Sequence, residues 1–177
     1  MSDVFSRTGP AIRLIPDIKF ICNSSIVGYT VAMMKKNGEQ HPMIQIWREI
    51  KTNSSDSVYQ KIGTGVPLDK SLCTNGLNET STNVFHCDLN QVSRVSVQVG
   101  DILGLELPPA NDAASTLFFA KVVRGPMNYV FSKHQLPSSS AELQLLNSTS
   151  QLSQEVPQIA LQLGSGNISP QHNIIII

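Results

Sequence analysis

Apolar and polar residues alternate with a period of two along most of this chain, and this periodicity constrains the fold more than any other feature. Ile12 and Leu14 flank Arg13, and Ile18 and Phe20 repeat the same spacing. A period of two places successive side chains on opposite faces of a strand, whereas a helix requires a period near 3.6. The pattern therefore predicts β-strands with one buried face and one face toward water.

Turn-forming residues such as Lys35-Lys36-Asn37-Gly38, Gly63-Thr64-Gly65 and Pro108-Pro109 divide this pattern into short segments. The segments expected to form strands are residues 12–14, 18–20, 26–34, 43–47, 58–62, 84–89, 92–99, 102–107, 117–123, 129–131, 143–146 and 159–163. One alternative concerns residues 138–146, where three serines that could cap a helix precede Ala141-Glu142-Leu143.

The number and spacing of these segments predict the fold class. Strands separated by roughly 8–12 residues are typical of a sandwich or barrel. We expect an all-β, jelly-roll-like antiparallel β-sandwich that forms a single domain over residues 10–163. Residues 1–9 are then a disordered or linker N-terminus, and residues 164–177 are a C-terminal tail.

Charge and hydropathy exclude two classes of partner. Charged residues make up only 15% of the chain, and 13 basic residues balance 13 acidic ones. No basic field exists to attract nucleic acid or an anionic membrane surface. Residues 1–20 show no signal-peptide pattern, and no run of about 18 apolar residues is present. Ile174–Ile177 are either an apolar tail or the start of a membrane span, so membrane contact would need segments absent from this chain.

Enzyme motifs are missing from the sequence. Gly63-Thr64-Gly65 lacks the residues of a phosphate-binding loop, and Gly164-Ser165-Gly166 is no nucleophile elbow. The histidines are far apart and form no ligand pair on one element; they are His41, His86, His134 and His172. We therefore expect no enzymatic activity, no catalytic residue, no metal site and no cofactor.

Three cysteines leave at least one thiol outside any internal disulfide. We expect Cys73, in a polar loop, to bond Cys87, whose position on a strand is fixed by sheet pairing. Such a bond would stabilise the fold by about 3 kcal/mol. Cys22 shares a strand face with Phe20 and is expected to be buried and reduced; the pairings 22–73 and 22–87 remain alternatives.

Acceptor triplets for N-glycosylation indicate an extracellular setting. They occur at Asn23, Asn53, Asn78, Asn147 and Asn167, whereas composition alone predicts about two. Asn53, Asn78 and Asn147 lie in predicted loops, where a glycan acceptor must be. Pro170 weakens the triplet at Asn167. The alternative is that Asn and Ser are simply common in loops.

Trp47, the only tryptophan, is either a core anchor or a platform for a sugar ring. Ile44 and Ile46 share one strand face, which leaves Trp47 on the other. We expect a buried anchor against the facing sheet, since large aromatic side chains dominate sandwich cores. Ile46 or Trp47 should share this core with Phe20, Val31, Leu103 and Phe118.

Four segments occur in an order and spacing that resemble a known extracellular module. They are Cys22–Tyr29, Ile44–Glu49, Val97–Leu105 and Gly125–Phe131. The module they resemble is found in large extracellular and cell-surface proteins of early-branching animals, often at the start of receptor ectodomains. The resemblance covers about residues 10–163 and implies a jelly-roll-like sandwich outside the cell. It supplies no catalytic residue and no established ligand.

These observations favour a non-catalytic extracellular or cell-surface binding or adhesion module, whose partner is an unknown protein or glycan. One alternative is a secreted carbohydrate-binding domain, which would need exposed aromatic side chains among Trp47, Tyr29, Tyr59 and Tyr129. Another is a jelly-roll hydrolase, which would need two carboxylates or metal ligands in one cleft. A cytosolic β domain whose triplets are never used is the remaining possibility.

Overall fold

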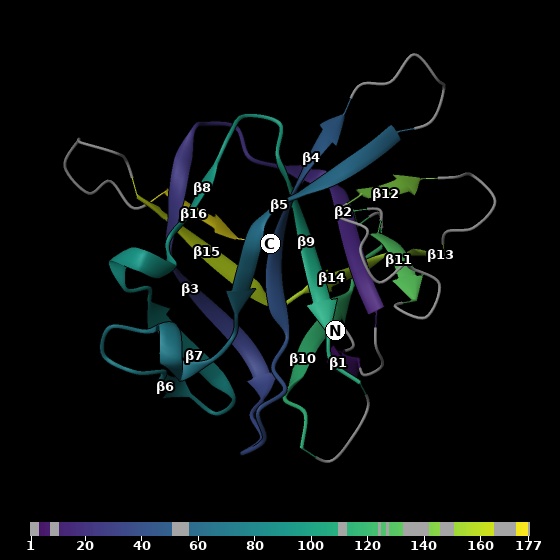
Figure 1. Cartoon of the computed structure of the whole chain (residues 1–177). Coiled ribbons are helices and arrows are strands. Elements are labelled where there is room, and N and C mark those ends of the chain that lie inside the picture. Colours follow the sequence, from purple (N-terminus) through teal and green to yellow (C-terminus); the bar gives the residue numbers. More distant parts are fainter. Residues whose placement is uncertain are drawn as a thin grey trace.

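The computed structural model describes residues 4–7, 11–50, 57–109, 113–123, 125–126, 128–132, 142–145, 151–164 and 173–176. This part of the chain forms two sheets packed face to face (Figure 1). Every pairing between its named strands is antiparallel. The predicted all-β sandwich is therefore confirmed.

The first sheet has nine strands and is organised around β3, the eleven-residue strand that the sequence predicted at residues 26–34. β3 pairs with β15 along most of its length, and with β7, β8 and β10 in turn. The strands of this sheet are β1 (Val4–Arg7), β3 (Ser24–Met34), β6 (Asn78–Ser81), β7 (Val84–Asp88), β8 (Val95–Val97), β10 (Thr116–Lys121), β14 (Glu155–Pro157), β15 (Ile159–Gly164) and β16 (Asn173–Ile176).

The second sheet has seven strands in the order β12-β5-β4-β9-β2-β11-β13. They are β2 (Ala11–Lys19), β4 (Met43–Ile50), β5 (Ser57–Pro67), β9 (Ile102–Leu107), β11 (Asn128–Ser132), β12 (Glu142–Leu145) and β13 (Gln151–Ser153). Two short 3₁₀ helices, η1 (Lys70–Leu72) and η2 (Gln91–Ser93), lie in connections. No helix in the described ranges is long and apolar enough to cross a bilayer.

The main core lies between the sheets and is built by the alternation that the sequence shows. Ile44 and Ile46 of β4 point into it, as do Val31 of β3 and Phe119 of β10. These side chains, with Leu103 of β9, are at most 1% exposed, so the inner faces are dry. The predicted burial of Phe20, Val31, Ile46 and Leu103 is confirmed. The prediction that Phe118 is buried is wrong: Phe118 is half-buried, and its neighbour Phe119 takes the core position.

A second, smaller core covers the outer face of the seven-stranded sheet. Trp47 is 1% exposed there and packs in a cluster with Leu14, Ile102 and Tyr59. The prediction that Trp47 is buried is confirmed, but its expected position against the facing sheet is wrong. Successive side chains of a strand point to opposite faces. Because Ile44 and Ile46 of β4 occupy the inner face, Trp47 takes the outer face.

The seven-stranded sheet curls around this second core. Tyr59 of β5 and Tyr129 of β11 both contact the cluster, although β4, β9 and β2 separate their strands in the sheet. Burial is the main cause that raises the pKa of Tyr59, followed by Glu49; Tyr129 also contributes. β5 and β11, the strands next to the two edges of the sheet, therefore approach each other across its outer face.

The structure differs from the sequence prediction in several elements. β1 and β16 are strands inside the segments expected to be linker and tail. β12 is a strand where helical turns were the alternative. β5 continues past the predicted stop, because Gly63 and Gly65 adopt positive φ angles of 68° and 89° in a bulge.

Candidate functional site

An open pocket of about 360 Å³ lies at one end of the seven-stranded sheet. β4 begins there and β5 and β9 end there, because Met43 pairs with Pro67 on one side and Glu106 on the other. The pocket is lined by Glu39, Gln40, His41, Met43, Pro67, Asp69, Ser71, Glu106, Pro108 and Pro109. Its volume is within the range of roughly 300–1,000 Å³ typical of ligand sites.

Prolines determine where this end of the sheet lies. Pro42 precedes β4, Pro67 closes β5, and Pro108 follows β9. A proline cannot donate a ladder hydrogen bond, so it is confined to strand ends and edges. The chain leaves the sheet at these residues, and the polar side chains beside them line the pocket.

Two short hydrogen bonds hold the Asp69 carboxylate in the pocket wall. It caps η1, accepting hydrogen bonds from the Lys70 backbone N–H at 2.6 Å and from the Ser71 hydroxyl at 2.7 Å. Partial burial acts to raise the pKa of Asp69, but these hydrogen bonds and nearby His41 outweigh it and hold the pKa below its usual value. Asp69 therefore stays ionised at any ordinary pH.

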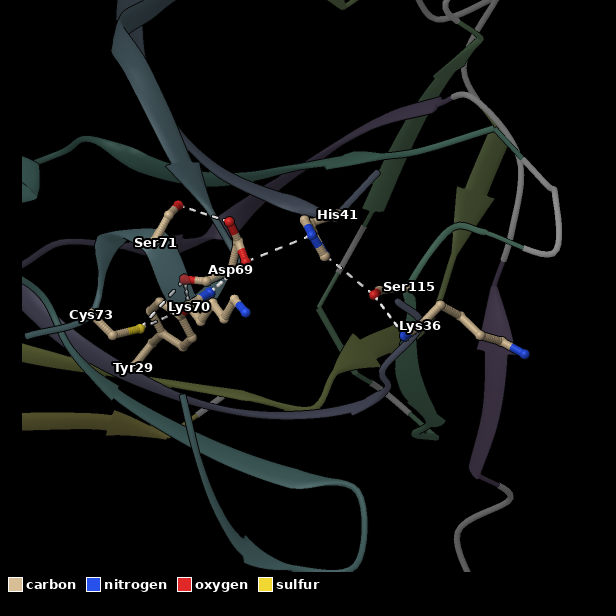
Figure 2. Close-up of polar contacts among 8 residues, drawn as sticks. All are labelled: Tyr29, Lys36, His41, Asp69, Lys70, Ser71, Cys73 and Ser115. Atoms are coloured by element: carbon tan, nitrogen blue, oxygen red, sulfur yellow. Dashed lines mark hydrogen bonds and ion pairs between the residues drawn. The ribbon is translucent and has the colours of Figure 1, made fainter. Parts of the chain in front are cut away.

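His41 lies between Asp69 and Ser115 (Figure 2). Its Nε2 is 3.7 Å from Asp69 Oδ1, and its Nδ1 is 3.2 Å from Ser115 Oγ. Ser115 Oγ accepts a hydrogen bond from the Lys36 backbone N–H, so its own proton is available for His41 Nδ1. Ser115 is 1% exposed and does not line the pocket, so this trio fixes three loop segments rather than presenting a nucleophile.

Glu106 connects the pocket to the outer core. Its carboxylate accepts a hydrogen bond from Gln45 Nε2, and Gln45 Oε1 accepts one from Trp47 Nε1 at 3.1 Å. Gln45 and Trp47 are each 1% exposed. The carboxylate on the pocket wall is therefore positioned by a buried network rather than by solvent.

The disulfide Cys73–Cys87 lies directly behind η1 and confirms the predicted pairing. It bonds the segment that carries Asp69 and Ser71 to β7. The Tyr29 hydroxyl lies 3.9 Å from Cys73 Sγ (Figure 2), and burial, followed by the charge of Asp69, raises the pKa of Tyr29 well above its ordinary value. Cys22 is free, as predicted, but it is half-buried rather than buried.

The pocket combines negative charge with hydrocarbon walls. Glu39, Asp69 and Glu106 line it, together with Met43 and the prolines. None of the described residues that line the pocket is a lysine or an arginine. Within the same part of the chain, no three His, Cys, Asp or Glu side chains are placed to hold a metal ion. The arrangement suits a cationic group attached to an apolar stem.

The predicted glycan acceptors are only partly within the described residues. Asn23 is exposed, and Asn78 is exposed at the first residue of β6 rather than in a loop. Asn53, Asn147 and Asn167 lie outside the described residues.

The aromatic residues named for a sugar platform are mostly unsuitable for that role. Trp47, Tyr29 and Tyr59 are 1%, 0% and 4% exposed, and Tyr129 is half-buried. His86 bonds Thr30 and Asp88, away from the pocket lining, while His134 and His172 lie outside the described residues.

Sequence reasoning did not single out the pocket. His41 was one of four scattered histidines, and Glu39, Asp69 and Glu106 belong to no local motif. The available signal was positional: His41, Asp69 and Glu106 each lie within two residues of a proline that bounds a strand. Comparisons with protein families, curated proteins and solved structures found no match for the chain.

Proposed function

We propose that this chain is a non-catalytic extracellular binding module, and that its pocket binds a cationic side chain of a protein partner. The observation that carries the proposal is the pocket itself, with three carboxylates, no lysine or arginine among its described lining residues, and walls of proline and methionine. A guanidinium or ammonium group can meet the carboxylates while its methylene stem contacts the walls. Loops presented at one end of a rigid sandwich are a common place for recognition.

The extracellular setting is supported by the disulfide and the acceptor triplets. Cys73 and Cys87 are 9% and 0% exposed and bonded, and such bonds persist in oxidising compartments. The exposed acceptors Asn23 and Asn78 are accessible for glycans. The resemblance to an ectodomain module points in the same direction.

A hydrolase is the second candidate, because the pocket brings together the carboxylates that this alternative required. A general acid needs a raised pKa, whereas the pKa of Asp69 is lowered. The state of Asp69 thus favours charge recognition over proton donation. Release of reducing sugar from an oligosaccharide panel, abolished by Asp69→Asn, would support the hydrolase instead.

The binding proposal is tested with N-acetyl-arginine amide and its neutral isostere, N-acetyl-citrulline amide. The arginine compound should produce saturable NMR shifts at His41, Met43 and Ser71, and the citrulline compound should not. Asp69→Asn should weaken binding at least tenfold, a cost of about 1.4 kcal/mol. Because Asp69 has a lowered pKa, its contribution should persist down to pH 5.

The matched control is Glu79→Gln, which removes an exposed carboxylate on β6, outside the pocket lining. This variant should bind the arginine compound like the unmodified protein. Equal shifts with both compounds, or equal weakening by both variants, would refute a charge-specific pocket.

A further inference from the structure

Two exposed apolar side chains lie on adjoining loops at the end of the sandwich where β2 is connected to β3, and we refer to them as the patch. Ile21 is 83% exposed and Val99 is 64% exposed. Their neighbours are bonded to each other: Gly100 N–H donates to the Phe20 carbonyl at 2.9 Å, and Phe20 N–H donates to the Asp101 carbonyl at 2.8 Å. Ile21 and Val99 therefore project from adjoining loops.

The loop that carries Val99 is held rigidly. Asp101 accepts a hydrogen bond from the Gln98 backbone N–H at 2.8 Å and pairs with Arg48 through two contacts of 2.7 and 3.0 Å. Asp101 is 1% exposed, and Gly100 adopts a φ of 90° that favours glycine. Because this turn is fixed, Val99 cannot fold inward to bury its side chain.

Asn23 lies beside this patch and begins an acceptor triplet with Ser24 and Ser25. Its Oδ1 accepts a hydrogen bond from the Val99 backbone N–H at 3.0 Å. The donor identifies this atom as the oxygen, so Nδ2, the atom that a glycan modifies, takes no part in this hydrogen bond. Among the described residues, nothing is bonded to that Nδ2, and the Asn23 side chain is exposed.

We propose that Asn23 carries an N-glycan whose first sugar covers Ile21 and Val99. This inference rests on the proposed extracellular function, because the modification needs the secretory pathway. The acetamido methyl group and the C–H face of the sugar can contact the two aliphatic side chains, while its hydroxyl groups face water. The hydrogen bond from Val99 fixes the Asn23 side chain, so less conformational freedom is lost when the sugar contacts the patch.

The experiment uses the full chain, expressed behind an added signal peptide and secreted from animal cells. Peptide mapping should find a glycan on Asn23, and Ser25→Ala should remove it while leaving the Asn23–Val99 hydrogen bond in place. Loss of this glycan should lower Tm by roughly 2–4 °C. Trimming to a single sugar should leave Tm unchanged, because the first sugar alone contacts the patch.

The matched control is Asn78→Gln, which removes the acceptor on β6, a strand whose residues are all exposed. Loss of a glycan there should not change Tm. In the Ile21→Ser/Val99→Ser variant, removing the Asn23 glycan should no longer lower Tm.

The outcomes distinguish this inference from the function on which it rests. A secreted chain without glycans at any acceptor would contradict both. A glycan on Asn78 with Asn23 unmodified would overturn this inference alone. The inference would also be overturned if Asn23 carries a glycan but removing that glycan leaves Tm unchanged.

Discussion

At the scale of single residues, the position of Trp47 depends on the absence of a side chain elsewhere. Gly104 lies on the neighbouring strand β9, and a Cβ there would be 2.5 Å from Cδ1 and Nε1 of Trp47. Only glycine leaves room for the indole to lie flat on the sheet. The indole N–H then reaches Gln45, which positions Glu106 on the pocket wall.

Replacing Trp47 tests whether the outer core stabilises the fold. Trp47→Ala should lower the free energy of unfolding by about 3–5 kcal/mol, because it removes the largest buried side chain of the cluster and leaves a cavity. Urea denaturation, followed by circular dichroism, measures the change. Ile21→Ala, at an exposed apolar position, should stay within about 0.5 kcal/mol in unglycosylated protein. If Trp47→Ala lowers the free energy of unfolding no more than Ile21→Ala does, the outer cluster contributes little to stability.

The burial of Trp47 could be predicted from sequence, but the pocket residues could not. Trp47 follows Ile46 in a short apolar strand segment, and its large aromatic side chain favours burial. His41, Asp69 and Glu106 come from three separate chain segments. Their approach depends on the register that places Met43 between Pro67 and Glu106, and no local pattern encodes that register.

At the scale of elements, β3, β4 and β15 could be predicted because each has a buried face. β3 and β15 alternate buried and half-buried residues, and the sequence shows the same rhythm. β6 was not predicted, because all four of its residues are exposed and it has no apolar signal. β4 is buried on both faces, which explains why its apolar residues run together.

The disulfide should hold η1 and the pocket wall in place. It closes a sequence separation of 14 residues, and its loss should lower the free energy of unfolding by about 3 kcal/mol. The double variant Cys73→Ser/Cys87→Ser should also show faster amide exchange at Ser71 and Leu72. Cys22→Ser is the control, because this thiol takes part in no disulfide. Unchanged exchange in the double variant would mean that hydrogen bonds alone hold η1.

At the scale of the whole molecule, the sandwich is held together by pairings between segments far apart in the chain. β3 pairs with β15, more than a hundred residues later, and the two sheets share a polar contact inside the apolar core. Alternation predicts which residues are buried, but it does not say which strands become neighbours. The fold class could therefore be predicted from sequence, while the strand order and the second core could not.

Arg13 and Glu155 form this contact between the sheets. Arg13 lies on β2 of the seven-stranded sheet and Glu155 on β14 of the nine-stranded sheet, and their side chains meet at 2.7 Å. The Arg13 guanidinium also lies 4.6 Å from the centre of the Phe119 ring. Both charged residues are less than 10% exposed, so each depends on a partner for its charge to remain buried.

Removing one charge should therefore destabilise the fold more than removing both. Arg13→Met should cost about 3–5 kcal/mol, because it leaves the Glu155 carboxylate buried without its cation. Arg13→Met/Glu155→Leu should cost less than Arg13→Met alone, since no charge then remains to desolvate. A double-mutant cycle, with the free energy of unfolding measured by urea denaturation, tests this prediction. If the losses of the two single variants simply add in the double variant, the pair does not couple the sheets.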